Sequence, residues 1–258
     1  MKIAIIGAGN MGGAIARGLA KGSLVRVEDI RVSNPSPGKL EALKAEFPDM
    51  QVTADNSEAV ASADIVVLAV KPWMVGEVLN KLQLKETQML ISIAAGIKLG
   101  DLWQMLGQKG NPLFRVIPNT AISEMQSMTL VSCSQASQEQ IQLVLDIFSE
   151  MGLAMLIPEE KMAAATAMTS CGIAYALKYI QAAMQAGIEL GVRPKDGMRM
   201  VAQSLKGAAE LILANDTHPS VEIDKVCTPG GLTIKGINQL EHDGFTSALI
   251  NAIKVSAV

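Results

Sequence analysis

The run IIGAGNMGGAIARGL, residues 5–19, constrains the fold of this chain more than any other segment. A short apolar run leads directly into three glycines with the spacing G-x-G-x-x-G, and an Ala-rich helical pattern follows. In this pattern the first glycine permits a tight turn, the second lets backbone approach a pyrophosphate, and the third lets the helix pack closely on the strand. The N–H groups at the helix N-terminus favour an anion. We therefore expect a dinucleotide site, with a purely structural glycine turn as the alternative. The expected contacts are Gly7, Ala8, Gly9, Asn10, Met11 and Gly12.

Strand-like apolar runs alternate with helical patterns through the first 157 residues. Such alternation is typical of right-handed crossovers and of a mostly parallel sheet with helices on both faces. With the glycine turn, it predicts an α/β Rossmann-type N-terminal domain with a parallel sheet, residues 1–158. The expected strands are residues 2–6, 30–33, 65–70, 89–93, 113–117, 129–132 and 153–157, and the helical patterns include residues 10–21, 39–46 and 138–151.

The pattern changes after Pro158. Residues 159–258 contain no convincing strand, and Ala- and Met-rich stretches at helical spacing cover residues 162–190, 194–214, 221–226 and 233–253. The stretch 162–190 is apolar nearly all round, so a helical domain of this size would bury it against a second chain. We predict an all-α C-terminal dimerisation domain over residues 159–258.

The end of the second strand bears on the choice of cofactor. An NAD site usually has a carboxylate there for the ribose 2′-hydroxyl, whereas VSNPSPGK, residues 32–39, has none. Nothing in this loop therefore repels a 2′-phosphate, and we expect NADPH to be preferred, with NADH as a second donor. Ser33, Asn34 and Ser36 are the expected contacts, and Lys39 lies one turn further on. An ordinary surface loop is the alternative interpretation.

Three more segments follow later strands: AVKP at residues 69–72, SIAAGI at 92–97 and RVIPNTA at 115–121. Ligands of open α/β sheets bind beyond the carboxyl ends of the strands. The small residues of AAG would let backbone approach a nicotinamide ring, whereas Lys71 is equally well explained as a solvated loop charge. The candidate cofactor contacts here are Ala69, Val70, Lys71, Pro72, Ala94, Ala95, Gly96 and Asn119.

Composition excludes several functional classes. A net charge of -3 with 3% aromatic residues gives no footprint for nucleic acid. Three cysteines without a C-x-x-C pair, and two histidines, are a poor basis for a disulfide framework or a metal site, and they indicate a reducing compartment. No apolar run fits a membrane span or a signal peptide. We expect a cytoplasmic protein with neither membrane nor nucleic-acid partners.

The stretch TSCGIAY, residues 169–175, places four small residues at the start of a helical run. Small polar side chains fill a core poorly. They either let two helices approach closely or line the floor of a site, and both interpretations stay open.

Over nearly its full length the chain resembles the pyrroline-5-carboxylate reductase family. The resemblance rests on the glycine turn, Asn56, AVKP, AAG, PNT at residues 118–120, HP at 218–219, TPGGLTIKG at 228–236 and GF at 244–245. It implies an NAD(P)H-dependent oxidoreductase that reduces the C=N bond of 1-pyrroline-5-carboxylate to L-proline. It also implies a Rossmann domain followed by a helical domain that interleaves with its dimer partner, sometimes within a decamer.

The resemblance also implies roles for individual residues. Asn56 would lie near the adenosine of the cofactor. The loop that contains Gly230 and Gly231 would hold the substrate carboxylate and imine through Thr228, Leu232 and the catalytic Thr233. Cys171 and Glu159 match positions near the substrate, and a solvated charge at the domain boundary explains Glu159 equally well.

Three segments depart from the family pattern. The usual SGSGPAY reads TSCGIAY here, which affects the fit of the substrate. The arginine often found after Asn34, which meets the 2′-phosphate, is Pro35, which affects selectivity for NADPH. The usual TSPGG begins with Cys227.

The segment TPGGLTIKG suits a small anionic imine on physical grounds. Free N–H groups at Leu232 and Thr233 would point at a carboxylate, and the Thr233 hydroxyl could hydrogen-bond the ring nitrogen. A plain N-cap with a glycine turn is the alternative. No general acid is evident, since His218 fits a turn cap better; an imine that enters already protonated needs none.

Two other functions remain open at this point. One is a related imine or ketone reductase whose altered TSCGIAY floor accepts a different ring. The other is a non-catalytic dinucleotide-binding regulatory protein. The intact PGG-x-T and AAG segments argue against the second, because a regulator has no need of the carboxylate cradle.

Overall fold

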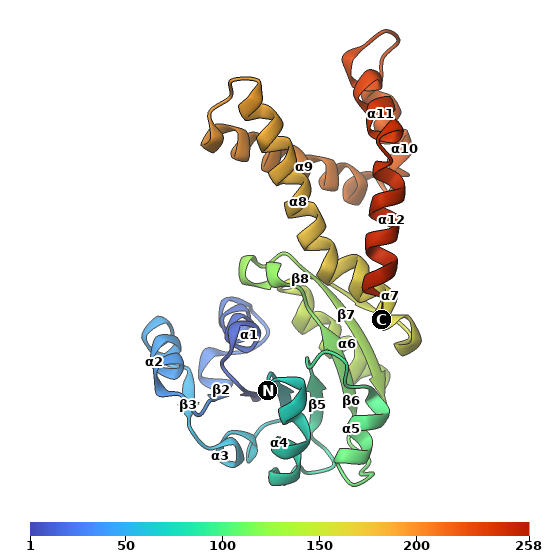
Figure 1. Cartoon of the computed structure of the whole chain (residues 1–258). Helices are drawn as coiled ribbons and strands as arrows, with labels where there is room; N and C mark the ends of the chain where they lie inside the picture. Colours follow the sequence, from blue (N-terminus) through green and yellow to red (C-terminus); the bar gives the residue numbers. More distant parts are fainter. Residues whose placement is uncertain (258) are drawn as a thin grey trace. The chain divides into compact units, whose positions relative to one another are not determined.

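The computed structural model describes residues 1–257, and the chain divides into two compact units, Met1–Ser170 and Cys171–Val258. The first unit has α/β architecture and the second is helical (Figure 1).

An eight-stranded sheet forms the centre of the first unit, in the order β3-β2-β1-β4-β5-β6-β7-β8. Neighbouring strands are parallel, except that β6 and β7 are antiparallel. The inner strands are runs of Ile, Val and Leu buried on both faces, as a sheet between two helical layers requires. The strands are β1 (Ile3–Ile6), β2 (Ile30–Ser33), β3 (Gln51–Thr53), β4 (Ile65–Leu68), β5 (Met89–Ser92), β6 (Leu113–Ile117), β7 (Ser127–Ser134) and β8 (Gly152–Leu156).

Helices pack on both faces of this sheet. One hydrophobic cluster joins the sheet to α1, α2 and α6, and a second joins it to α3, α4 and α5. The helices on the two faces are α1 (Asn10–Lys21), α2 (Pro37–Glu46), α3 (Asn56–Val60), α4 (Val75–Lys81), α5 (Leu99–Met105) and α6 (Gln138–Ser149). Short 3₁₀ turns in this unit are η1 (Val27–Asp29), η2 (Pro72–Met74), η3 (Thr120–Glu124) and η4 (Glu159–Lys161).

The predicted fold class, a mostly parallel sheet followed by an all-α region, is confirmed. The seven predicted strands are present, and the order of β1 to β6 is that of a dinucleotide-binding sheet. The sequence prediction missed β3. This strand has only three residues, QVT, none of them fully buried, because it lies at the edge of the sheet.

The C-terminal region is a series of helices. The stretch 162–190, expected as one helix, contains the π-helical turn η5, and the stretch 233–253 is two helices. The break falls at Gly244, whose φ of 79° lies in the left-handed region that glycine adopts without strain. The helices are α7 (Met162–Thr166), α8 (Gly172–Glu189), α9 (Pro194–Asn215), α10 (Pro219–Val226), α11 (Leu232–His242) and α12 (Phe245–Ser256), with η5 (Ala167–Cys171) between α7 and α8.

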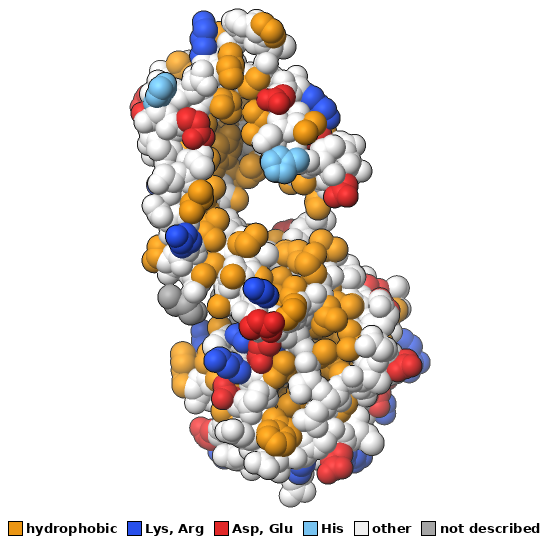
Figure 2. Space-filling model, turned by 90° about the vertical axis from the view of Figure 1, so that its right-hand side faces the viewer, with side chains coloured by type: hydrophobic (Ala, Val, Ile, Leu, Met, Phe, Trp, Pro, Cys, Tyr) orange, Lys and Arg blue, Asp and Glu red, His pale blue; other side chains and the backbone are white. Residues whose placement is uncertain are grey.

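The helical unit leaves much of its apolar surface exposed. Among the described residues of α8 to α12, only Gly197 is buried. Leu177 is 59% exposed and Leu213 69%. Figure 2 shows hydrophobic side chains over much of the upper, helical part. Exposed apolar area of this extent is typical of a surface that another chain covers. No helix within residues 1–257 is long and apolar enough to cross a membrane.

In the sequence, the strand pattern gives way to a helical pattern after Pro158. The residue contacts of the structure instead divide the chain into its two units after Ser170. Residues 159–170 belong to the first unit because Met162 is fully buried in a small cluster with Ile117 and Leu130 of the sheet. The change of secondary structure and the change of packing partner therefore fall about a dozen residues apart.

Candidate active site

The glycine turn, residues 7–12, joins β1 to α1 with the geometry of an anion site. Gly7 has a φ of 105°, and a Cβ there would lie 2.6 Å from the carbonyl oxygen of Ala69. A Cβ on Gly12 would overlap the carbonyl oxygen of Gly7. Above Gly9 there is open space, and no side chain among the described residues caps the N-terminus of α1. The first N–H groups of α1 therefore remain available for a pyrophosphate.

The AVKP segment touches this turn directly. Ala69 donates its N–H to the carbonyl of Ile6 over 2.8 Å, which fixes the start of the segment beside β1. Lys71 is exposed, and its Nζ lies 6.0 Å from the ring centroid of Trp73, itself 79% exposed. The first two residues of the segment thus lie against the glycine turn, and the next ones face solvent.

The loop after β2 is held by two buried polar residues. Asn34 accepts a hydrogen bond from the N–H of Ala8 at 3.0 Å and donates to the carbonyl of Ser36 at 3.1 Å. Ser33 is fully buried, and its hydroxyl lies 2.7 Å from Oδ1 of Asn56, at the start of α3. Asn34 and Ser33 therefore connect the glycine turn, the β2 loop and α3. Pro35, Ser36 and Lys39 are exposed on the same loop.

The AAG segment lies between two tethered ends. The hydroxyl of Ser92, the last residue of β5, accepts the N–H of Ala94 at 3.3 Å. At the other end Lys98 donates its N–H to Asp101 at 3.0 Å. Ala95 and Gly96 are exposed between these ends, and Gly96 has a φ of 80°. Small exposed residues thus lie on a tethered loop at the carboxyl end of β5, where ligands of open α/β sheets bind.

Glu159 connects this segment to the sheet. Its Oε1 accepts the N–H of Leu99, the first residue of α5, at 2.8 Å, and it lies 3.2 Å from Nη1 of Arg115 in β6. The sequence prediction named Glu159 and missed Arg115. The signal was present, because an arginine inside the buried strand LFRVI is unexpected without a charged partner.

Asn119 meets Thr169, the first residue of the TSCG stretch, within the first unit. Asn119 is buried, accepts the N–H of Ala121 at 3.1 Å and donates to the carbonyl of Thr169 at 3.5 Å. Thr169 lies in the π-helical turn η5, a local widening that often occurs at functional sites. The hydroxyl of Ser170 is buried without a hydrogen-bond partner among residues 1–257. The stretch thus offers a polar atom as well as small side chains. Its third residue, Cys171, is half-buried.

The carboxylate loop, residues 228–233, belongs to the helical unit. The N–H of Gly231 donates to the carbonyl of Thr228 at 2.9 Å, and Gly230 has a φ of 72°. A Cβ on Gly231 would lie 2.6 Å from the hydroxyl oxygen of Thr228, so glycine keeps the turn tight. No side chain of the described chain caps the 11-residue α11 that follows. Leu232 is 85% exposed, and Thr233 is exposed beside it.

His218 caps the start of helix α10, whereas the sequence had predicted a turn cap. Its Nδ1 accepts the N–H of Ser220 at 3.2 Å, at the start of α10. A nitrogen used as an acceptor in a cap is poorly suited to act as a general acid.

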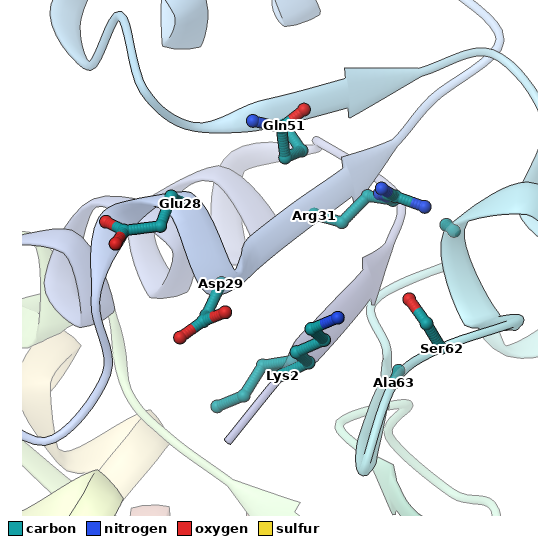
Figure 3. Close-up of a pocket in the computed structure, with 9 residues that line it drawn as sticks. Lys2, Glu28, Asp29, Arg31, Gln51, Ser62 and Ala63 are labelled. Atoms are coloured by element: carbon teal, nitrogen blue, oxygen red, sulfur yellow. The ribbon is translucent and has the colours of Figure 1, made fainter.

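One cavity lies apart from these residues, and another is lined in part by Glu159. A cavity of about 140 Å³ opens at the amino ends of β1 and β2, opposite the predicted cofactor edge. Figure 3 shows its acidic residues, Glu28 and Asp29, on one side and the guanidinium of Arg31 turned away from them. A second, of about 330 Å³, lies beside Glu159 and Cys133. Burial raises the pKa of the Cys133 thiol, so that thiol is a poor nucleophile. No cluster of metal-ligating side chains occurs among the described residues.

Comparison with known families defines the class of the protein. Residues 2–96 match the family described as NADP oxidoreductase coenzyme F420-dependent, and residues 159–258 match the family described as pyrroline-5-carboxylate reductase dimerisation. The fold and the glycine turn are therefore those of an NADP-dependent oxidoreductase with a helical region for oligomerisation.

Whole-chain relatives identify the family. Pyrroline-5-carboxylate reductase 1 of Dictyostelium discoideum is 36% identical over 99% of this chain, which spans 48% of that relative. Pyrroline-5-carboxylate reductase of Methanosarcina acetivorans is 34% identical, with 98% of this chain and 94% of the relative covered. The crystal structure of Plasmodium falciparum pyrroline carboxylate reductase, with NADP bound, has a TM-score of 0.87 at 29% identity, over 100% of this chain and 95% of that one. The chain belongs to the pyrroline-5-carboxylate reductase family.

Proposed function

We propose that this chain transfers hydride from NADPH to the C=N bond of 1-pyrroline-5-carboxylate and forms L-proline, with NADH as a second usable donor. One observation carries the proposal: within residues 1–257, α1 and α11 both begin without a side-chain cap, and each follows a glycine turn. The N-terminus of α1 suits a pyrophosphate, and that of α11 suits a small carboxylate. Family membership over the full length supports this assignment.

The dinucleotide supplies the hydride, and the chain supplies binding and orientation. The N–H groups of the glycine turn would hold the pyrophosphate. Asn34 and Ser33 would orient the β2 loop and Asn56 around the adenosine, with Ser36 exposed toward the 2′-position. Two segments would line the cofactor. Beside the turn it would meet Ala69, Val70, Lys71 and Pro72. The nicotinamide would meet Ala94, Ala95 and Gly96, with Asn119 behind them.

The carboxylate loop would bind the substrate. N–H groups of Leu232 and Thr233 would donate to its carboxylate, with Thr228, Gly230 and Gly231 forming the turn, and the Thr233 hydroxyl would hydrogen-bond the ring nitrogen. Cys171 and Glu159 are proposed neighbours of the substrate. A substrate that enters as the iminium already carries its proton, so no residue has to donate one.

The helical region, residues 159–258, would form a homodimer, and such dimers would assemble further, up to a decamer of five dimers. We place the boundary of the dinucleotide-binding domain at residues 158/159, where the dimerisation family begins. The negative net charge argues against nucleic acid as a partner. A cytoplasmic location is proposed because all three cysteines are free.

The decisive experiment follows NADPH oxidation with 1-pyrroline-5-carboxylate and measures the proline formed. We expect one proline for each NADPH consumed. Turnover with other cyclic imines but not with this one would instead favour a related imine reductase. Cofactor binding without turnover of any imine or ketone would leave a regulatory protein and refute the proposal.

A further inference from the structure

Arg115 is a charged residue inside a sheet, and its burial requires a reason. It occupies the middle of β6, and its side chain is only 12% exposed. The strand register places it beside Ser92 of β5 and Ser132 of β7. Its Nε has no hydrogen-bond partner among the described residues, so the guanidinium is only partly satisfied. A buried cation of this kind is costly unless an opposite charge pairs with it.

The group that pairs with it is the carboxylate of Glu159. Oε1 of Glu159 accepts from Nη1 of Arg115 at 3.2 Å and from the N–H of Leu99 at 2.8 Å. One oxygen atom therefore joins β6 to the start of α5. The side chain of Glu159 is 29% exposed, so solvent screens this ion pair less than a fully exposed one.

The backbone before Glu159 is fixed to the sheet. Ile157 donates its N–H to the carbonyl of Val131 at 2.8 Å, and its own carbonyl accepts the hydroxyl of Ser132 at 2.6 Å. Glu159 follows two residues later, so its backbone is held close to a segment that is hydrogen-bonded to β7. Its carboxylate can hold the start of α5 in place, because its own anchor lies on β7 and not on α5.

The segment it holds is AAG, residues 94–96. Leu99 follows this segment by three residues, and Ser92 tethers the other end through the N–H of Ala94. Ala95 and Gly96 lie exposed between the two tethers. Loss of the Leu99 tether would let the surface predicted to face the nicotinamide shift.

We propose that Glu159, held by Arg115, is a positioning residue that fixes the AAG segment against the nicotinamide during hydride transfer. The inference rests on the proposed function and deepens it. Glu159 acts through Leu99, and a contact with the substrate is not required. A misplacement of about 1 Å can reduce an enzymatic rate roughly 100-fold, so a loosened segment has a measurable effect.

The test compares Glu159→Gln and Arg115→Met with the wild type, and uses Glu160→Gln as the control. Glu160 is an exposed neighbour, so its substitution makes the same charge change without the contacts. In both test variants we expect kcat to fall at least ~10-fold and the Kd for NADPH to rise, with KM for the imine within ~2-fold. The deuterium isotope effect on kcat should grow, because hydride transfer becomes slower than the other steps. Glu160→Gln should behave as the wild type.

Two further measurements separate this role from others. The double variant should be about as slow as the slower single variant, because the two residues act as one unit. Amide hydrogen exchange of residues 93–99 should increase in both single variants, a readout that does not depend on turnover. A rise in KM for the imine alone, with unchanged exchange, would overturn the proposal in favour of a substrate contact. A lower Tm with unchanged kcat, Kd and exchange would overturn it in favour of a structural ion pair.

Failure of the proposed function would look different. A wild type that binds NADPH but does not reduce the imine would refute the assigned reaction, whereas the exchange and NADPH-binding comparison would still decide whether Glu159 positions the segment.

Discussion

The hydroxyl oxygen of Ser33, at the end of β2, lies 2.7 Å from Oδ1 of Asn56, the first residue of α3. Ser33 is fully buried, so its hydroxyl is committed to this bond and is not exposed to a ligand. Because Oδ1 of Asn56 accepts from Ser33, the Nδ2 end of the amide is the one left to donate. The serine therefore sets the orientation in which Asn56 can meet an adenosine.

The first prediction concerns this pair. Ser33→Ala removes the donor and leaves the Asn56 amide without orientation. Loss of one such bond costs about 0.5–1.5 kcal/mol, which corresponds to a rise in the Kd for NADPH of roughly 2- to 12-fold. Titration of cofactor fluorescence measures the Kd. Ser62→Ala, an exposed serine, is the control and should leave it unchanged. Equal Kd values for all three proteins would show that the pair has no role in binding.

The second prediction concerns the carboxylate loop. Thr233→Ala removes the hydroxyl proposed to meet the ring nitrogen, so KM for the imine should rise and kcat/KM should fall. The loss of binding free energy should be about 0.5–1.5 kcal/mol, the contribution of one hydrogen bond. Thr233→Ser keeps a hydroxyl and should retain most of the activity. Steady-state kinetics at saturating NADPH provide the comparison. An alanine variant with wild-type kinetics would remove Thr233 from the mechanism.

The fold was predicted well from the sequence, because hydrophobic periodicity and glycine spacing are enough to indicate this fold. Buried strands such as IAII and IVVL and the G-x-G-x-x-G turn are local patterns that tertiary packing reinforces. The short edge strand β3 carries no such pattern. The π-helical turn η5 was missed because it depends on how residues 167–171 pack, not on their helical spacing.

The site was predicted only in part. The sequence identified which loops follow the strands, but it did not reveal what holds them. That Asn34 contacts the cofactor stays a prediction, and no pattern in the sequence indicated that its amide joins Ala8 to Ser36. The link between Arg115 and Glu159 spans 44 residues, and no local pattern predicts such a contact.

The third prediction concerns assembly. At micromolar concentration the protein should be a dimer or a larger oligomer, because α8 to α12 expose so much apolar surface. Leu177 is 59% exposed on α8, and Leu177→Glu would force a charge into the interface. We expect this variant to dissociate at concentrations at which the wild type stays associated. Lys178→Glu changes a neighbouring exposed residue and serves as the control. Light scattering measures the mass, and a monomeric wild type would contradict the prediction.

The fourth prediction concerns stability against pH. Partial burial alone would raise the pKa of Glu150, but hydrogen bonds from the Ser23 hydroxyl and the N–H groups of Ser23 and Leu24 outweigh it and lower the pKa. A lowered folded-state pKa gives stability that is present above the unfolded pKa of about 4.5 and is lost as pH falls through the folded value.

Glu150→Gln should therefore lower the free energy of unfolding by about 1 kcal/mol at pH 7, and the difference should shrink below pH 4. Urea unfolding at several pH values measures it. Glu86→Gln, an exposed glutamate, should show no such dependence. A difference for Glu150→Gln that is constant from pH 7 to pH 3 would contradict the stabilising role assigned to the charge of Glu150.

The last prediction concerns the choice of cofactor. Pro35 is exposed beside Ser36, and no carboxylate stands at the end of β2 to repel a 2′-phosphate. Ser36 can donate one hydrogen bond, and Lys39 can supply a flexible charge, but neither matches the planar fork of an arginine. We therefore expect both cofactors to work, with a modest preference for NADPH. Pro35→Arg should strengthen NADPH binding by about 1–3 kcal/mol and leave NADH binding nearly unchanged, because NADH lacks the 2′-phosphate. Pro35→Gln, uncharged and of similar reach, should have little effect. The ratio of kcat/KM for the two cofactors in each protein is the measurement. A wild type that uses NADH alone would refute this reading of the loop, and so would a Pro35→Arg ratio that does not move toward NADPH.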